Sequence, residues 1–535
     1  MKIIQTHNME PTKFDAWTQD QVYNGLDVCI TADVLDALIP QMDDHTRATY
    51  AFSRELQGPV LEMRLRGCLI DAGRKVEVID EFWELLELYE SYLNRIVFEG
   101  VGMPVFNWRS NKDLSQLFYS ELSLPTQRHG HSVTTDRGAR EKLEIYPVAT
   151  IIARLINTLA ELGDKISVLR TEIDPDGRIR TSYNIAGTST GRFSSSLSEF
   201  GTGGNLQNVE ESLRSIFISD PGYKLAKFDA KSGESFIVGA IEWNQFHDDR
   251  FLEACNTGDP HTAVARLCWP NLGWTGDLNA DKKLAEQPFY RHLSYRDACK
   301  RIGHGSNYLG GPQQISDETR VPVDIVTNFQ RLYFKAFPAH RLWHEHCRDT
   351  LRRTGTCISL MGRKRNFHRR RLEEKTLKEY IAYNPQSSLA DIVNRGMLNT
   401  WRHFKATGDP VCVMFQDHDA TTWMYPEELE DTIIPVILKH LNVPVELADG
   451  KFLEIPYDCE VGWNKGKHSA EKNPDGLKKY SGHDDRDRTP QVGLLDRVFR
   501  KTHRAGARPG NLAKVDGNLG ALRGARAKGL GQDHE

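Results

Sequence analysis

Two aspartates follow short apolar runs that are typical of β-strands. Asp229 comes directly after residues 224–228, and Asp419 follows residues 411–415 across a polar turn. Carboxylates at neighbouring strand tips form an oxygen-rich site that suits Mg2+, which keeps waters and substrate phosphates in its shell. Two such ions can activate an attacking hydroxyl and stabilise a leaving oxygen. Taken singly, each aspartate is equally typical of an ordinary strand end or turn.

A helical segment between these aspartates carries a polar stripe. Arg296, Lys300, His304 and Tyr308 recur every four residues, so they lie along one slowly drifting line of a helix. Guanidinium and ammonium groups bind phosphate oxygens, and two rings further along could lie against a sugar and a base. The stripe therefore suits a nucleoside triphosphate. The alternative is an amphipathic helix whose Arg and Lys merely extend their charged ends into water.

Composition limits the class of protein. The 535 residues suffice for three or four domains, and no apolar run approaches the roughly 20 residues of a membrane span. The N-terminal segment lacks the apolar core of a secretory signal, which predicts a cytoplasmic protein. The nine cysteines include no C-x-x-C pair, so reduced thiols are the simplest interpretation.

Basic residues are clustered although the total charge is nearly balanced. The formal net charge is -4, from 69 basic and 73 acidic residues. Basic side chains gather at residues 296–301, 363–371 and 497–528. Such clusters are candidate phosphate contacts, although a charge run in a large protein is more often a solvated face.

The elements that must position these residues can be predicted from periodicity. Hydrophobic spacing indicates helices over residues 18–39, 46–66, 77–98 and 147–170. The apolar run at residues 421–425 is expected to return as the hairpin partner of the strand before Asp419. An Asp-Gly pair at residues 176–177, between short β-rich runs, predicts another hairpin.

The order of these motifs resembles family A DNA polymerases, the class of bacterial DNA polymerase I and many phage replicases. Asp229 with Glu234 is similar to the family's motif A, R-x3-K-x3-H-G-x2-Y at residues 296–308 to motif B, and QDHD at residues 416–419 to motif C. The resemblance spans roughly residues 50–468. Further segments follow in the family's order: RLRGCLID (64–71), FNWRSNKDL (106–114), DGRIRTSYN (176–184), TGRFSSS and NLQN (190–208), GDPHT (258–262), YFKAFP (333–338), SLMGRKR (359–365) and NPQSSLAD (384–391).

The resemblance implies an α+β fold, a right-hand polymerase with an antiparallel palm sheet, helical fingers and a helical thumb. The implied domains are an exonuclease-domain remnant (1–45), a palm-entry helix and loop (46–74), the thumb (75–170), the first palm part with motif A (171–243), the fingers with motif B (244–404), the second palm part with motif C (405–468) and a basic tail expected to be disordered (469–535).

The implied reaction is template-directed addition of dNTPs to a primer 3'-hydroxyl, in DNA replication or repair. Asp229, Asp419 and the backbone carbonyl of Ala230 would hold two Mg2+ ions, with Mn2+ as a substitute. Lys300 would donate a proton to the departing pyrophosphate. The nucleotide would contact Arg296, Lys300, His304, Tyr308, Glu234 and His261, with Glu234 closing the space under the sugar C2'.

Primer-template DNA is the implied macromolecular partner. Minor-groove acceptors are shared by all four base pairs, so contacts there check shape without reading sequence. The groove and the primer terminus would be lined by Arg192, Gln207, Asn208, Gln386 and His418.

Four residues depart from the family's pattern. Asp417 stands where an aliphatic residue is usual, and Ala420 where an acidic residue usually follows the catalytic aspartate. His304 replaces a Phe or Tyr, and Leu309 replaces a glycine. No metal-binding carboxylate is removed, so the reaction class stands and nucleotide selectivity is what these departures affect.

YNGLD, at residues 23–27, resembles the third motif of the family's proofreading exonuclease, and the first two motifs are absent. We therefore expect no intrinsic proofreading, or a separate exonuclease polypeptide as a partner. A processivity subunit is a further candidate partner, and no membrane partner is expected. The truncated region favours a phage-type enzyme.

Two alternatives remain. A single-subunit RNA polymerase shares this palm and a similar motif B, but Glu234 and the NLQN loop weigh against it, as does the lack of a promoter-binding N-terminal domain. A catalytically inactive protein that binds primer-template DNA is disfavoured by intact Asp229, Asp419 and Lys300. Primer extension with Mg2+ distinguishes these hypotheses.

Overall fold

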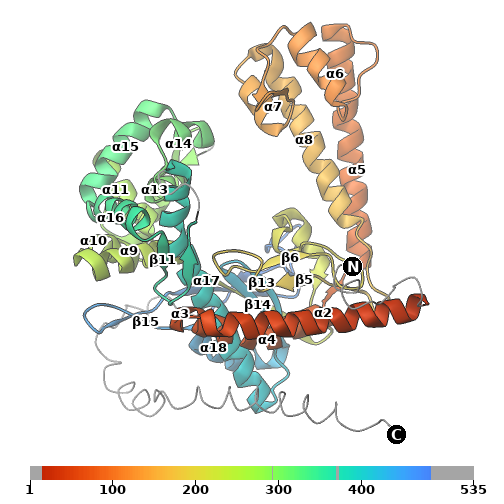
Figure 1. The fold of residues 1–535 in the computed structure, drawn as a ribbon. Coiled ribbons are helices and arrows are strands. Elements are labelled where there is room, and N and C mark those ends of the chain that lie inside the picture. Colours follow the sequence, from red (N-terminus) through yellow and green to blue (C-terminus); the bar gives the residue numbers. More distant parts are fainter. Residues whose placement is uncertain (1–14, 292, 369–372, 483–535) are drawn as a thin grey trace.

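The computed structural model describes residues 15–291, 293–368 and 373–482. An antiparallel sheet of five strands lies at its base, and two helical parts rise from it on opposite sides (Figure 1). The strand order is β13-β14-β8-β17-β18. These strands are β8 (Tyr223–Ala230), β13 (Cys412–Asp417), β14 (Ala420–Pro426), β17 (Tyr457–Gly462) and β18 (Lys478–Lys479).

The register of this sheet brings the two aspartates together, as the strand patterns predict. Asp229 near the end of β8 pairs with Ala420 at the start of β14. Asp419 lies in the tight turn between β13 and β14, because Asp417 pairs with Ala420. The backbone N–H of Ala230 donates to the carbonyl of Asp419 at 3.0 Å, so the two strand tips are joined directly.

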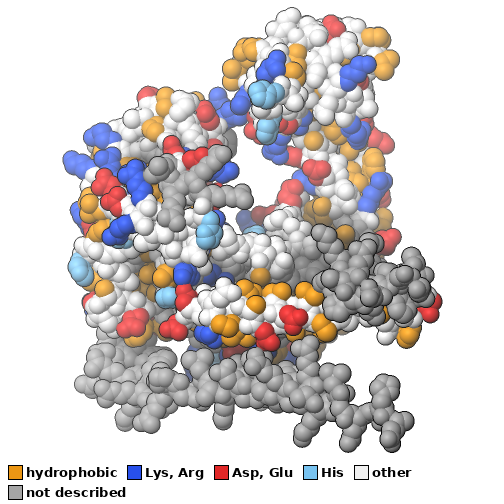
Figure 2. Space-filling model, in the orientation of Figure 1, with side chains coloured by type: hydrophobic (Ala, Val, Ile, Leu, Met, Phe, Trp, Pro, Cys, Tyr) orange, Lys and Arg blue, Asp and Glu red, His pale blue; other side chains and the backbone are white. Residues whose placement is uncertain are grey.

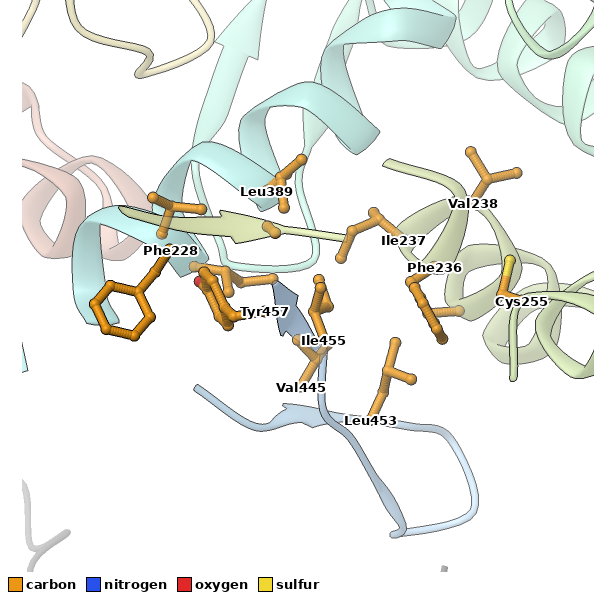
Figure 3. Packing of buried hydrophobic residues seen from close by; sticks show 14 of the residues in the cluster. Phe228, Phe236, Ile237, Val238, Cys255, Leu389, Val445, Leu453, Ile455 and Tyr457 are labelled. Carbon is orange, nitrogen blue, oxygen red and sulfur yellow. The ribbon is translucent and has the colours of Figure 1, made fainter. Parts of the chain in front are cut away.

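An apolar core holds these strands in place. Every residue of β14 is buried. Figure 3 shows Phe228 of β8, Tyr457 of β17 and the nearby Ile455, with Phe236 and Ile237 of helix α9 (Gly233–Phe246) in the same core. Each large apolar side chain buried in this way contributes about 1.5–3 kcal/mol, so the platform under Asp229 is firmly packed.

A helical arm, residues 72–169, rises from one side of the sheet (Figure 1). Its long helices α5 and α8 pack on one another over a separate apolar core. Ser110 caps α6, accepting a hydrogen bond from the Asp113 N–H at 3.3 Å. The arm consists of α5 (Ala72–Arg95), α6 (Asn111–Ser115), β2 (Arg128–His129), β3 (Ser132–Val133), α7 (Arg137–Leu143) and α8 (Pro147–Leu169).

A helical lobe, residues 233–407, rises from the other side, and Figure 2 shows an open hollow between lobe and arm. The polar stripe lies on α13, which begins at a capping box formed by Ser294 and Asp297. After α9, the lobe contains α10 (Arg250–Asn256), α11 (Pro260–Cys268), α12 (Leu278–Ala285), β9 (Pro288–Tyr290), β10 (Leu293–Ser294), α13 (Tyr295–Asn307), α14 (Pro312–Thr319), α15 (Val323–Ala336), α16 (Ala339–Arg353), β11 (Thr356–Ile358), β12 (Lys364–Asn366) and α17 (Glu374–Thr407).

The N-terminal helix lacks the buried apolar face that the spacing of its hydrophobic residues predicts. Helix α2 (Ala16–Leu38) forms where residues 18–39 are expected to be helical, but none of its residues is buried. Trp17 is 72% exposed and Val28 71% exposed, and Figure 2 shows hydrophobic side chains along this helix at the surface. The predicted block at residues 46–66 is two helices, α3 (Asp44–Glu55) and α4 (Gln57–Arg66).

The hairpin predicted around the Asp-Gly pair is wrong. The turn forms, since the Gly177 N–H donates to the Asp174 carbonyl at 2.9 Å. The strand after it, β4 (Arg178–Ile179), forms its ladder with β1 (Cys68–Ile70), and the residues before the turn contribute only the hydrogen bond from the Asp174 N–H to the Arg178 carbonyl at 2.9 Å. The remaining small elements are β5 (Ser182–Asn184), β6 (Ser194–Ser196), β7 (Phe217–Ile218), α18 (Glu430–Leu441), β15 (Val445–Glu446) and β16 (Phe452–Leu453).

The predicted start of the C-terminal tail is also wrong. Part of the segment 469–482 is folded against the sheet, because β18 pairs with β17 and the side chains of Leu477 and Tyr480 are buried. The cationic runs at residues 369–371 and 497–528 lie outside the described residues. All nine cysteines lie within the described part, and each is a free thiol. Among the described residues, no helix combines the length and apolarity needed to cross a membrane.

Candidate active site

A pocket of about 550 Å³ opens where α9, α11 and α13 meet the tip of the sheet. It is lined by polar residues from all three predicted motifs, which the fold thus brings together from separate parts of the chain. Those predicted from sequence are Ala230, Glu234, His261, Lys300, His304 and Asp419.

The two aspartates of this site differ in their surroundings. The Asp229 side chain is 50% exposed and its carboxylate lies 3.1 Å from the Lys227 ammonium. Asp419 accepts a hydrogen bond from the Arg192 guanidinium at 3.1 Å. Burial raises the pKa of Asp419 above its usual value; Arg192 opposes this, whereas the carboxylates of Glu234 and Asp229 add to it.

This crowding of carboxylates fits a divalent cation. Asp419 is costly to ionise here because it is partly desolvated and lies near other negative charges. A dication would relieve both costs. Within the described residues, no three His, Cys, Asp or Glu side chains are arranged to hold a metal by themselves. The donor set therefore suits Mg2+, which binds through one or two carboxylates and completes its shell with waters and substrate phosphates.

Glu234 is fixed on both carboxylate oxygens. Arg192, from the TGRFSSS loop, donates to its Oε1 at 2.6 Å, and the Tyr308 hydroxyl donates to its Oε2. Burial, and then the adjacent Glu234 carboxylate, raise the pKa of Tyr308 well above its usual value, so the phenol stays a proton donor. Glu234 and Tyr308 form a rigid polar wall at the junction of α9 and α13.

Asp259 orients Arg296. This role of Asp259 was not predicted from the sequence. The Nε and Nη2 of Arg296 donate to its two oxygens at 2.8 and 3.1 Å, and the Thr262 hydroxyl donates to it at 2.5 Å. Although burial raises the pKa of Asp259, these contacts lower it overall. The GDPHT segment was the available signal, but sequence alone did not pair it with Arg296.

The other residues of the α13 stripe reach the pocket differently. Lys300 and His304 are exposed, and the His304 ring lies edge-on to Tyr308 with centroids 4.8 Å apart. His261, on α11, is half-buried, and burial lowers its pKa to about 4. His261 is therefore neutral near pH 7 in this state and offers a hydrogen bond, not a charge.

Asp417, one of the departures from the family's pattern, has a charged partner. The Lys465 ammonium lies 2.8 Å from its Oδ2, and the Lys465 side chain is only 4% exposed. The same ammonium lies 3.7 Å from the centroid of the Phe415 ring. An aliphatic residue is thus replaced by one half of a buried ion pair, directly before His418 and Asp419. Sequence reasoning missed Lys465.

Two other departures have structural counterparts. Ala420 brings no carboxylate, and the acidic neighbour of Asp229 is instead Asp458, its cross-strand partner on β17. Leu309 has a φ of 61°, a left-handed conformation that glycine adopts without steric cost. The glycine usual at this position would therefore be relaxed where leucine is strained.

Of the residues expected to contact DNA, Arg192, Gln207 and His418 lie at the same hairpin. Gln207 is 6% exposed and donates its amide to the Gln416 carbonyl at 2.9 Å. Gln416 in turn donates to the His418 carbonyl at 2.8 Å. Asn208 is exposed, and Gln386 on α17 is half-buried. In this state Gln207 holds the hairpin that carries His418 and Asp419.

The exonuclease-like residues lie apart from this pocket. Tyr23 and Asp27 are both exposed on α2, and Tyr23 is 61% exposed. The expectation that the chain lacks intrinsic proofreading stays a prediction.

Comparison with known proteins agrees with this geometry. DNA polymerase I of Thermus aquaticus is 25% identical over 394 residues, which are 70% of this chain and 43% of the relative. DNA polymerase I of Helicobacter pylori is 25% identical over 427 residues, 74% of this chain and 43% of the relative. The enzyme of Thermus thermophilus is 23% identical over 473 residues, 85% of this chain and 52% of the relative. The chain thus spans about half the length of the curated relatives it matches.

A solved structure shares the fold. The polymerase domain of M. smegmatis Pol1, in complex with DNA primer-template and dNTP, superposes with a TM-score of 0.62 and 21% identity over 77% of this chain and 69% of that one. The family model for DNA polymerase family A matches residues 79–467. This match covers four of the five sheet strands, most of the arm, the whole lobe and every pocket residue described above, and the chain therefore belongs to DNA polymerase family A.

Proposed function

We propose that this chain is a DNA-directed DNA polymerase that extends a primer 3'-hydroxyl with dNTPs on a DNA template. One observation carries the proposal: the pocket in which Asp419, Glu234 and Lys300 converge from three separate motifs. The names of its curated relatives and membership of the family support the same activity.

The domain roles follow from this proposal. The helical arm would be the thumb, the helical lobe after α9 the fingers, and the five-stranded sheet with most of α9 the palm. In this assignment the thumb spans residues 75–170, the fingers 244–404, and the palm 171–243 together with 405–482, which includes the packed β18 segment. Primer-template DNA would lie in the hollow of Figure 2, against the palm.

Asp229 and Asp419, with the Ala230 carbonyl, would hold the two divalent ions that family A polymerases use, here assigned as Mg2+. When bound, such ions supply activation of the primer hydroxyl and stabilisation of the leaving oxygen. Asp419 first has to exchange its hydrogen bond from Arg192 for the ion. Arg192 would then be free to donate to the primer-template minor groove.

Residues of α13 would bind and protonate the triphosphate. Arg296, already held in a fixed orientation by Asp259, offers its remaining N–H donors to phosphate oxygens. Lys300 would donate a proton to the pyrophosphate oxygen as the bond to the α-phosphate breaks. His261 would donate a hydrogen bond, and His304 would lie beside the sugar.

Glu234 and Tyr308 would select the sugar. Both oxygens of Glu234 are engaged, so the carboxylate cannot easily turn away from a 2'-hydroxyl. A ribonucleotide would have to break one of these contacts or leave a buried polar group unpaired, which disfavours it.

Single-nucleotide primer extension tests the proposal. With Mg2+ and a defined template, the chain should insert only the dNTP complementary to the next template base. A matched control is Glu446→Ala, an exposed carboxylate on β15 that should behave as the parent. Preferred insertion of rNTPs would indicate an RNA polymerase instead. Tight primer-template binding without any insertion would indicate an inactive binding protein.

A further inference from the structure

Behind the pocket wall, buried polar side chains from four helices form one chain of contacts, in which an ion pair is followed by two hydrogen bonds. Glu242 on α9 lies 2.6 Å from Nδ1 of His340 on α16, and both side chains are at most 1% exposed. Nε2 of His340 lies 3.1 Å from the Tyr333 hydroxyl on α15. That hydroxyl donates to Oδ1 of Asn307 on α13 at 2.7 Å.

The donors and acceptors fix the direction of this chain. The Asn307 Oδ1 can only accept, so it takes the single proton of the Tyr333 hydroxyl. His340 Nε2 must then donate to the Tyr333 oxygen. Its Nδ1 faces the Glu242 carboxylate as a close ion-pair contact. The two hydrogen bonds from His340 to Asn307 thus have one direction, while Glu242 is joined to them by charge and proximity and its oxygens have no hydrogen bond of good geometry to any described residue.

One end of this chain reaches the nucleotide pocket. Asn307 and Tyr333 line the pocket themselves. Tyr308, the next residue after Asn307, donates to Glu234, which lies on the same helix α9 as Glu242. The chain and the wall of Glu234 and Tyr308 thus form a closed ring of contacts between α9 and the end of α13.

Further contacts hold the end of α13 in the same way. Nε2 of His344 on α16 lies 2.8 Å from the Asn307 carbonyl. Gln330 on α15 donates to the Ser306 hydroxyl at 3.1 Å. These polar groups are set among aromatic rings, such as Phe251, whose centroid lies 4.6 Å from that of His340.

A buried ion pair is a poor source of stability. Desolvation of the two charges offsets their attraction, and apolar residues of similar volume are often as stable or more so. The value of such a pair lies in the geometry it imposes. Here that geometry concerns the end of α13, which carries one half of the proposed sugar-selecting wall.

We propose that Glu242 and His340 are positioning residues for sugar selection. Through Tyr333 and Asn307 they hold the end of α13 against α9, so that Tyr308 and Glu234 keep the separation that closes the space under the sugar C2'. This inference rests on the proposed polymerase function and deepens it, because neither residue touches the nucleotide itself.

Two variants separate positioning from folding. The double variant Glu242→Leu/His340→Leu removes both charges and fills their volume, so its melting temperature should stay near that of the parent. Tyr333→Phe removes only the hydroxyl that joins His340 to Asn307. The matched control is Ile434→Val on α18, a fully buried position remote from the pocket.

The readout is kcat and KM for single insertions of a dNTP and of the matching rNTP. We expect both variants to lower the ratio of kcat/KM for dNTP over rNTP about tenfold, the equivalent of one lost hydrogen bond. The loss should appear mainly in KM, and Ile434→Val should keep the parental ratio. Parental ratios in both variants would overturn the inference while leaving the polymerase assignment intact. A parent that inserts no nucleotide would overturn the proposed function first.

Discussion

The ion pair of Asp417 and Lys465 should make the motif C hairpin depend on both charges together. Asp417→Leu leaves the Lys465 ammonium, 4% exposed, without its partner. Removing one member of a buried pair costs about 3–5 kcal/mol, because the remaining charge is uncompensated. Removing both, in Asp417→Leu/Lys465→Met, should restore most of that loss.

The loss of stability in Asp417→Leu has an upper bound, because the buried Lys465 can release its proton. Burial already lowers the pKa of Lys465 from its usual 10.5, and Asp417 opposes that shift. Without Asp417 the pKa falls further, and the lysine can lose its proton instead of staying charged. At pH 7 this costs at most about 5 kcal/mol, and at pH 9 about 2 kcal/mol, at 1.36 kcal/mol per pH unit.

The sign of the pH dependence follows. Between the lowered folded pKa of Lys465 and 10.5, the unfolded chain binds more protons than the folded one, so stability rises with pH. This pH range is wider in Asp417→Leu, because loss of the carboxylate lowers the folded pKa of Lys465 further. This variant should therefore gain about 2–3 kcal/mol relative to the parent between pH 7 and pH 9.

Urea unfolding at pH 7 and pH 9 measures these differences for the parent, both single variants and the double variant. Lys467→Met, which removes an exposed lysine of the same segment, is the matched control and should change little. A loss for Asp417→Leu that is equal at both pH values would refute the reasoning. A double variant as unstable as Asp417→Leu would do the same.

Three further changes test the pocket. Asp259→Asn removes the charge that orients Arg296 and should raise KM for dNTP about tenfold with little change in kcat, measured by steady-state insertion; an unchanged KM would mean that Arg296 is oriented by other contacts. Glu234→Ala should admit ribonucleotides, because it opens the space under C2'; an unchanged dNTP/rNTP ratio would move the gate elsewhere. His261 has a folded pKa of about 4 against a usual 6.5, so the unfolded chain binds more protons in that window and the parent should lose about 1–2 kcal/mol between pH 7 and pH 5. His261→Gln should reduce that loss in urea unfolding, and an identical loss would contradict the neutral, buried state.

Local patterns were sufficient to predict which elements carry the candidate site residues. A strand ending in a carboxylate and a helix with a four-residue period are each visible within about a dozen residues, and both Asp229 and the α13 stripe lie where these patterns place them. The resemblance to the family then supplied the roles of Glu234 and Tyr308.

Contacts between distant segments could not be predicted. Lys465 reaches Asp417 only because the chain after β17 returns under the hairpin, and Arg296 meets Asp259 only once α11 and α13 are packed. The hairpin at the Asp-Gly pair failed for the same reason. The turn was correctly recognised, but the partner of β4 is β1, which lies in a much earlier part of the chain.

The central claim is that Asp229 and Asp419 act through metal ions at one site. The most direct test is single-turnover insertion by Asp229→Asn and Asp419→Asn, with the Kd for primer-template measured on the same preparations. Each variant keeps the size of the side chain and removes its negative charge. We predict a fall in the insertion rate of about a thousandfold or more, with Kd within about threefold of the parent, because a metal ligand is lost and no phosphate anchor. Insertion by either variant within about tenfold of the parental rate would contradict the account.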